Sequence, residues 1–219
     1  APTVDPPEKA TGDEAPRRGL HAAPHAQGAA GVKAAAAAGV DTVEHGTLLD
    51  DESLDMLVRA DVTLVPTLSA PHHIVRNVDA ATEEDRTKTE AVYERHLDSF
   101  RRAAAAGVRI AGGTDAGTPF NMHGSNAAEL RLMHEHAVEA MDPLEAIVAM
   151  TATAAETVGL DGQGTLDPGT HADLLVVDSD PTEDLTALND PGVVVKGGRV
   201  VAGADERMGR AIADTRGGN

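Results

Sequence analysis

The sequence of 219 residues contains no cysteine, which excludes disulfide bonds and thiolate metal sites. Any metal ion would therefore need imidazole and carboxylate ligands. Basic residues are also scarce, with 18 Lys and Arg against 36 Asp and Glu and a formal net charge of −18. This balance argues against nucleic acid and membrane surfaces as partners, because both bind basic faces. A surface rich in carboxylates and poor in lysine resembles that of proteins from salt-loving organisms.

Long apolar runs are missing as well. No stretch approaches the ~20 apolar residues that a membrane-spanning helix needs, and the N-terminus has no apolar core of the signal-peptide kind. These absences favour a soluble, cytoplasmic protein. Residues 1–19, rich in proline and without a hydrophobic period, predict an exposed loop, and the polar residues 204–219 predict a disordered tail.

From residue 20 onward, short apolar runs alternate with helical patterns, which is the signature of βα units and a parallel sheet. Strands are predicted at residues 20–26, 40–44, 62–66 and 108–111. Helices are predicted at 29–38, after Asp50, at 82–106, at 125–140 and after Asp142. Four βα units are half of a (β/α)8 barrel of the TIM type. The predicted fold class is therefore α/β, with a partial barrel over residues 20–160.

Capping residues mark several helix ends. Asp50 is expected to cap the second helix, whose apolar face includes Val58. Asp142 suits an N-cap, and Glu145 can close a capping box with it. After residue 160 the pattern changes to short strands at 172–178 and 193–201, the second broken by a Gly-Gly hairpin turn. Residues 161–203 therefore predict a small C-terminal β appendage, as strands of a composite β domain.

Three potential metal ligands fall at the ends of predicted strands. These are His25 in His-Ala-Gln-Gly, His45 in Val-Glu-His-Gly, and Asp115 in Gly-Gly-Thr-Asp-Ala-Gly. The carboxyl ends of parallel barrel strands face one pocket, so the three side chains would converge there. Two imidazoles and one carboxylate suit Zn²⁺ with water in the open position. Taken singly, each residue has an ordinary alternative, as a hydrogen-bonded structural histidine or a turn aspartate.

At these positions the sequence resembles the amidohydrolase superfamily, in particular its imidazolonepropionase-like and Xaa-Pro dipeptidase-like metal-dependent hydrolases. The resemblance runs from about Arg17 to Ala202. Further motifs follow the family's order, namely His123-Gly124 with Glu129-Leu130, Asp142–Ala146, Thr151–Ala155, Gly164–Gly169 and Ala172–Asp178.

The resemblance implies a role for each residue of the site. His25 and His45 would hold Zn²⁺ or another divalent metal ion. Asp115 would contact the metal and take a proton from the attacking water, which makes it the expected catalytic residue. His123 lies in the loop after Asp115, where it would either line the substrate pocket or stand in solvent.

Two elements of the family have no counterpart in the sequence. They are the His-x-His pair of the first barrel strand and the lysine of the fourth, which bridges two metal ions. His72-His73 cannot replace the pair, since adjacent strand residues point to opposite faces. The opening segment resembles the loop just after that lysine, so the resemblance implies a chain that begins after the fourth barrel strand. At most one weakly held metal ion is expected here.

Two functions follow as alternatives. In the first, the chain is part of a metal-dependent hydrolase that attacks amide or cyclic amide carbon–nitrogen bonds of a small molecule with metal-activated water. In the second, it is a catalytically inactive half-barrel, or a subunit for which another chain supplies the first four strands. A half-barrel exposes sheet edges and an apolar face, so this reading allows a homo-oligomer or a complementing chain as partner. Metal content discriminates between the two.

Overall fold

The structure is a computed structural model that describes residues 14–15, 17–77 and 83–203. The predictions for residues 1–13 and for the tail at 204–219 lie outside this part of the chain. Within it, no helix is both long and apolar enough to span a membrane.

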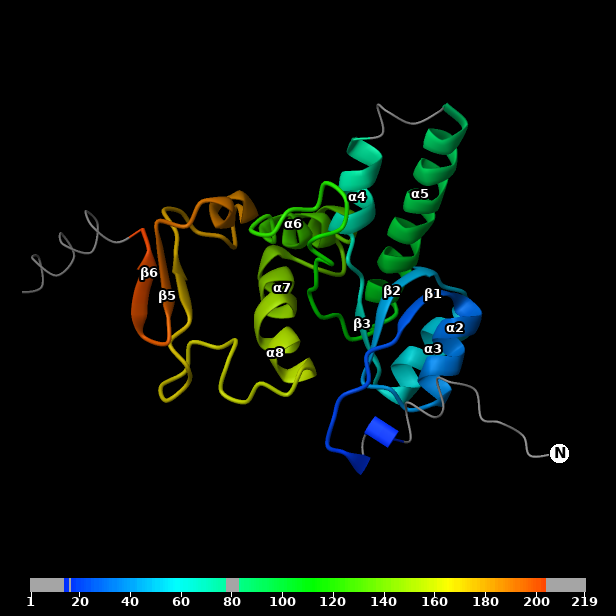
Figure 1. Cartoon of the computed structure of the whole chain (residues 1–219), viewed down its shortest axis with the longest axis horizontal. Coiled ribbons are helices and arrows are strands. Elements are labelled where there is room, and N and C mark those ends of the chain that lie inside the picture. The colour runs from blue at the N-terminus through cyan, green and yellow to red at the C-terminus, as the bar shows by residue number, and fades with distance from the viewer. Residues whose placement is uncertain (1–13, 16, 78–82, 204–219) are drawn as a thin grey trace, which may run out of the picture.

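Two three-stranded sheets organise the described residues (Figure 1). The first is parallel, in the order β1 (His25–Gly28), β2 (Thr42–Leu48), β3 (Thr63–Val65). The second is antiparallel, in the order β4 (Leu174–Val176), β5 (Val193–Lys196), β6 (Arg199–Ala202). The helices between them are α6 (Ala127–His136), α7 (Pro143–Val148) and α8 (Ala154–Thr157). The α/β class is confirmed, while the described residues form no closed barrel and the partial barrel stays a prediction.

The first crossover helix follows its prediction closely. α2 (Ala29–Ala37) begins directly after β1 and buries Val32 against the sheet and α3. Gly39 ends the segment with φ of +71°, a backbone conformation that costs glycine little. This helix returns the chain to β2, which pairs with β1 in parallel.

The second crossover helix, α3 (Asp51–Ala60), begins at the predicted cap. The N–H of Ser53 donates to Asp50 Oδ1 at 2.8 Å, and the N–H of Asp50 donates back to Ser53 Oγ. Leu57 is fully buried, but Val58 is 45% exposed. The expectation for Val58 was wrong because Leu54 and Leu57 face the core, while Val58 lies toward the solvent side of the helix.

Two of the predicted strands differ from the observed ones. The first begins at His25 instead of Leu20, although the Ala22 and Pro24 carbonyls accept bonds from β2. Two features keep this stretch irregular, since proline has no N–H and the Ala22 N–H donates to the Asp41 carboxylate. The strand at 108–111 is reduced to one parallel bridge between Leu64 and Ile110.

The glycines after this bridge explain where it ends. The N–H of Gly112 donates to the carbonyl of Ala149 at 2.8 Å, so the chain turns from the sheet toward the helix after α7. A Cβ atom at Gly112 would lie 2.3 Å from the sulfur of Met150, and one at Gly113 would lie 2.5 Å from Val65. Only glycine permits this close approach.

The longest helix, α5 (Glu83–Ala105), packs across β2 and lies beside α4 (Ser69–Arg76) (Figure 1). Its buried face contains Tyr93, Leu97 and Phe100, as the helical period predicts. His72 and His73 lie in α4, so the assumption that they stand on a strand was wrong. The His72 ring is instead within 2.9 Å of the Tyr93 hydroxyl, and burial lowers the pKa of His72 to about 4.

The C-terminal helices end differently from their predictions. α6 stops at His136, before residue 140, because the backbone of Ala137 leaves the helical conformation, with φ of −137° and ψ of 38°. The capping box at Asp142 and Glu145 is confirmed. α7 continues through a π-helical turn, η2 (Ala149–Thr153), into α8, and a 3₁₀ turn, η3 (Leu185–Asn189), precedes β5.

The short strands predicted after residue 160 form an antiparallel sheet, while the composite β domain over residues 161–203 stays a prediction. β5 and β6 are joined at Gly197-Gly198, and β4 pairs with β5. Lys196 and the N–H of Gly197 both contact the Asp173 carboxylate, which ties the turn to the start of β4. The sheet lies at the far end of the chain from β1–β3 (Figure 1).

Candidate active site

His25 and His45 come together on neighbouring strands. In the parallel register His25 is opposite Glu44, and Ala26 is opposite His45. The two imidazole rings lie edge to face with their centroids 4.2 Å apart. His25 is exposed and His45 is half-buried. The structure therefore places two of the predicted ligands side by side at the surface of the parallel sheet.

Strained backbone is concentrated around these histidines. Within the described ranges, the non-glycine residues with positive φ are His45 (74°), Asp61 (53°), Thr67 (53°), Asp115 (50°) and Phe120 (64°). Such a conformation is a clear outlier for a β-branched threonine, and each strained residue costs ~1–3 kcal/mol. All of them except Asp61 belong to β2 and the two loops that meet beside His45. Strain of this kind typically gathers at functional sites, which singles out this region independently of any motif.

Two contacts fix His45. Its Nδ1 lies 2.7 Å from the Thr67 hydroxyl, and its backbone carbonyl accepts a bond from Nε2 of the buried His96 at 3.0 Å. Burial lowers the pKa of His45, the nearby His25 lowers it further, and Asp115 opposes both. The ring is therefore kept neutral at neutral pH, which is the form that binds a metal ion. When Nδ1–H donates to Thr67, Nε2 presents its lone pair.

Asp115 stands in an exposed loop whose backbone is firmly held. Asn121 Nδ2 donates to the carbonyls of Thr114 at 2.6 Å and of Asp115 at 3.1 Å. The Ser69 hydroxyl donates to the same Thr114 carbonyl at 3.1 Å. The Asp115 carboxylate raises the pKa of His45, so it lies within electrostatic range of that ring.

The fit of these residues to a metal ion is partial. Two adjacent imidazoles with a carboxylate in range are the donor set that a divalent ion such as Zn²⁺ accepts. In the part of the chain that the structure describes, however, no group of three or more His, Cys, Asp or Glu side chains is arranged to hold a metal. The ligand set His25, His45 and Asp115 therefore stays a prediction.

Glu44 is a neighbour of the site that sequence reasoning missed. Its half-buried carboxylate accepts a bond from the Thr42 hydroxyl at 2.7 Å. Burial raises the pKa of Glu44, the bond from Thr42 opposes this, and Asp115 raises it further. Strand residues 44 and 45 would ordinarily point to opposite faces, but the left-handed backbone at His45 breaks this alternation. The charges of His25 and Asp115 therefore affect the pKa of Glu44 and also that of His45.

The loop after Asp115 carries exposed groups. A Cβ atom at Gly117 would lie 3.5 Å from His123 Nε2, so the histidine lies over this part of the loop and stays a predicted substrate contact. Phe120 is 56% exposed, whereas the other two aromatic residues of the sequence, Tyr93 and Phe100, are buried. Two features mark Phe120. Aromatic residues are scarce in the sequence, and the backbone of Phe120 has a positive φ.

Glu129 of α6 is fully buried, which is unusual for an acid. Its Oε1 accepts from the N–H of Leu68 at 2.8 Å, and its Oε2 accepts from the N–H of Ser69 at 2.7 Å. Burial raises the pKa of Glu129 to about 7, against the opposing effect of these bonds. The carboxylate thus caps the first turn of α4 from α6, a helix that is distant in sequence but in contact with α4.

We expect Glu129 to make stability depend on pH. Its folded-state pKa of about 7 is raised from an ordinary value of 4.5, so the stability linked to its protonated form is complete below pH 4.5 and is lost as pH rises through 7. The loss is on the order of 3 kcal/mol. Denaturant unfolding between pH 5 and 8 should show this fall in wild type and not in Glu129→Gln. Parallel curves for the two proteins would contradict the assignment.

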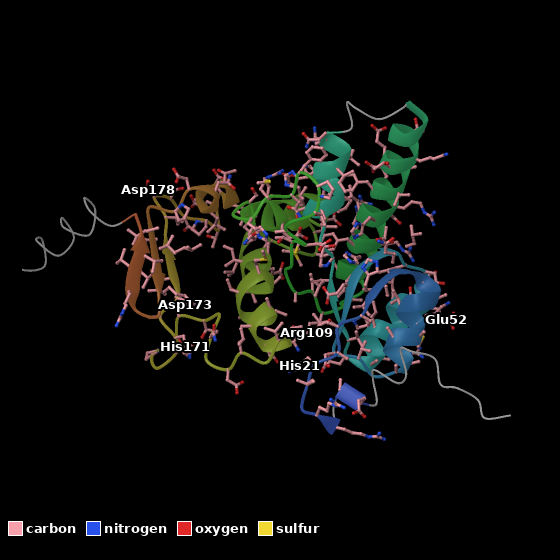
Figure 2. The ribbon with its side chains drawn as sticks, viewed as in Figure 1. His21, Glu52, Arg109, His171, Asp173 and Asp178 are labelled. Carbon is pink, nitrogen blue, oxygen red and sulfur yellow. The ribbon has the colours of Figure 1, made fainter. Side chains whose placement is uncertain are left out.

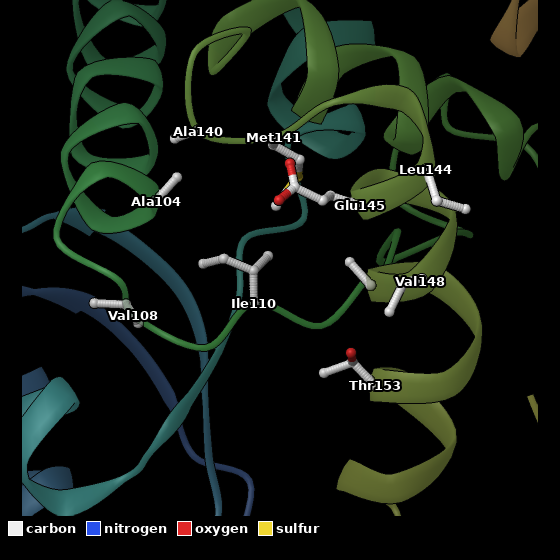
Figure 3. Close-up of a pocket in the computed structure, with 10 residues that line it drawn as sticks. Ala104, Val108, Ile110, Ala140, Met141, Leu144, Glu145, Val148 and Thr153 are labelled. Atoms are coloured by element: carbon white, nitrogen blue, oxygen red, sulfur yellow. The ribbon is translucent and has the colours of Figure 1, made fainter. Parts of the chain in front are cut away.

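Two hollows among the described residues lie away from the predicted metal ligands. A mostly apolar pocket of about 300 Å³ between α7 and residues 104–110 is lined by Ile110, Leu144 and Val148 (Figure 3), and none of the predicted site residues lines it. His21 and Arg109 line another hollow near the parallel sheet, each beside a carboxylate, whereas His171 and Asp173 lie in the C-terminal β unit (Figure 2).

Comparisons with known proteins agree with one another. The profile described as "Amidohydrolase family" matches residues 8–201. Ochratoxinase from Aspergillus niger is 32% identical over 197 residues, which are 87% of this chain and 40% of that protein. The structure of a Xaa-Pro dipeptidase with bound methionine superposes with a TM-score of 0.81 at 36% identity, over 90% of this chain and 48% of that one.

A prolidase complexed with N-methylphosphonate-L-proline gives a TM-score of 0.77 at 28% identity, over 89% of this chain and 48% of that one. The chain thus spans about half the length of the proteins that it resembles, or somewhat less.

Proposed function

The chain belongs to the amidohydrolase family, and from that premise we propose that it forms the metal-binding and proton-accepting part of a hydrolase of carbon–nitrogen bonds. The observation that carries the proposal is the contact between the His25 and His45 rings, 4.2 Å apart, beside strained backbone at His45 and Asp115. Neutral imidazoles and a nearby carboxylate are the groups that hydrolytic metal sites use.

Each residue has a distinct part in the proposed reaction. His25 and His45 would hold the divalent ion, Zn²⁺ being the ion that suits two imidazoles and a carboxylate best. A bound divalent ion would lower the pKa of water and polarise the scissile carbonyl. Asp115 accepts a proton from the attacking water through a carboxylate oxygen, and then returns it to the nitrogen of the leaving amine. The C–O bond forms as the water loses its proton to Asp115, and the C–N bond breaks as that proton reaches the nitrogen.

The substrates to test first are Xaa-Pro dipeptides. Two of the similar structures have names or ligands that refer to proline, one a Xaa-Pro dipeptidase and one a prolidase with a proline phosphonate. A Xaa-Pro dipeptide is a small amide, which agrees with an exposed site on the sheet surface. His123 and Phe120, on the loop beside Asp115, are the proposed contacts for the substrate.

Zinc titration by calorimetry tests the metal assignment. We expect at most one ion per chain, and we expect His25→Ala and His45→Ala each to weaken affinity at least tenfold, because each removes a ligand. The control is His171→Ala, which removes an exposed histidine of the β appendage and should leave affinity unchanged.

Other outcomes of the titration would change the assignment. Wild-type affinity in both histidine variants would show that the ion binds elsewhere. Tight uptake of two ions would contradict the expectation of at most one. Zinc binding without hydrolysis of any amide substrate would favour the alternative function, a subunit that depends on another chain.

A further inference from the structure

One short segment, residues 67–69, links the two halves of the candidate site. The Thr67 hydroxyl contacts Nδ1 of His45 at 2.7 Å. Two residues later, the Ser69 hydroxyl donates to the carbonyl of Thr114, directly before Asp115. The position of this segment therefore bears on the orientation of an imidazole ligand and on that of the proton acceptor.

The segment cannot hold its conformation unaided. Thr67 has a φ of +53°, in a region that β-branched residues avoid, and it is buried. The N-cap residue of α4, Leu68, has no side chain with which to cap the helix. A group outside the segment must therefore restrain it. The acceptor of the backbone N–H groups of the segment identifies that group.

Glu129 provides that restraint. Its two oxygens accept the N–H groups of Leu68 and Ser69, from a position 61 and 60 residues further along the chain. A local serine or aspartate could have capped α4 without the cost of burying an acid. A carboxylate on α6 does more than a local cap. It also fixes the segment relative to α6 and to the loop before α6, which contains Asp115.

We propose that Glu129 is a positioning residue, which fixes segment 67–69 so that Thr67 orients the His45 ring and Ser69 orients the peptide before Asp115. Asn121 completes the arrangement from the other side, since its amide holds the Thr114 and Asp115 carbonyls. This inference rests on the proposed function for its chemical purpose. The geometry that it describes can be measured without metal or substrate.

The test is the Glu129→Gln variant, which keeps the size of the side chain and turns an NH₂ group toward one of the two backbone donors. We expect changed ¹⁵N shifts of the His45 ring in the metal-free protein and faster hydrogen exchange at Leu68 and Ser69. Zinc affinity should fall at least tenfold as the ligand ring loses its orientation.

Two controls separate positioning from general stability. Glu145→Gln makes the same acid-to-amide change in the exposed capping box of α7, which has no contact with segment 67–69. Leu57→Ala removes a fully buried core side chain and destabilises the fold elsewhere. Neither control should move the His45 ring signals or the zinc affinity.

The outcomes are distinct. If Glu129→Gln loses stability as Leu57→Ala does and leaves the His45 signals and zinc affinity unchanged, Glu129 is only a cap for α4 and the inference is wrong. If wild type binds no zinc, the proposed function fails, while the ¹⁵N shifts and hydrogen exchange still decide the role of Glu129.

A second variant covers the case in which Glu129→Gln does not fold. Ser69→Ala deletes the hydroxyl that bonds Thr114 and also contacts Glu129, and it retains the N–H that Glu129 accepts. It should shift the side-chain amide signals of Asn121, which donates to the same Thr114 carbonyl, and leave the His45 ring signals in place. Unchanged Asn121 signals would overturn the inference.

Discussion

Asp115→Asn is expected to lower kcat for amide hydrolysis by roughly 10²–10⁴-fold with little change in stability. Asparagine has nearly the same shape as aspartate, but its amide cannot accept the proton of the attacking water. The substitution also suits the backbone, because asparagine adopts the left-handed conformation of Asp115, with φ of +50°, as readily as aspartate does. The loss of activity would therefore report on the carboxylate.

The chain offers a matched control in Asp61. This residue is also an exposed aspartate with positive φ, 53°, but it ends α3 and comes before β3, whereas the loop with Thr67 follows the other end of that strand. Asp61→Asn should keep kcat within a fewfold of wild type. The measurement is steady-state hydrolysis of the fastest-cleaved Xaa-Pro dipeptide in the zinc-loaded protein, with thermal unfolding alongside. Equal activity in the two variants would show that Asp115 is not the proton acceptor.

Predictions from the sequence succeeded where the physical cause is local. The caps at Asp50 and Asp142 act on N–H groups within one helical turn, so a few residues contain the whole signal. Gly39 ends α2 for the same reason, because its left-handed conformation depends on its own lack of a side chain. Such features need no knowledge of the rest of the fold.

Predictions failed where distant partners decide. The apolar run at 108–111 has the composition of a strand, yet one bridge to Leu64 is all that forms. What ends it is the bond from Gly112 to Ala149, in a helix that lies almost 40 positions further on. Val58 likewise belongs to the apolar face by period, and only the packing of α3 leaves it exposed.

The same distinction between local causes and distant partners applies to the candidate site. His25 and His45 were identified from their residue type and strand position, and their rings do meet. Glu129 and Thr67 act through contacts with segments remote in sequence, so their roles could not be derived from local pattern. One signal was present for Glu129, because it falls three and four residues before the buried Leu132 and Met133, and an acid on an apolar helix face calls for a buried partner.

The largest loss of stability is expected from Phe100→Ala. This side chain is 1% exposed and is among the largest fully buried groups of the core. Its truncation should cost ~3–5 kcal/mol, a large part of the roughly 5–15 kcal/mol that holds a domain folded. The cavity would open where α5 packs across β2.

Phe120→Ala is the matched control, because it removes the same side chain from an exposed position and should cost about 0.5 kcal/mol or less. Urea unfolding followed by circular dichroism measures both, and equal midpoints would show that α5 does not pack on the sheet as described.

The Phe100→Ala substitution should also weaken zinc binding at the candidate site. α5 also carries His96, which donates to the His45 carbonyl, and Ser99, which bonds the Thr47 carbonyl at 3.0 Å. A helix loosened at Phe100 can no longer hold the strand that bears His45, so zinc affinity should fall in Phe100→Ala and not in Phe120→Ala.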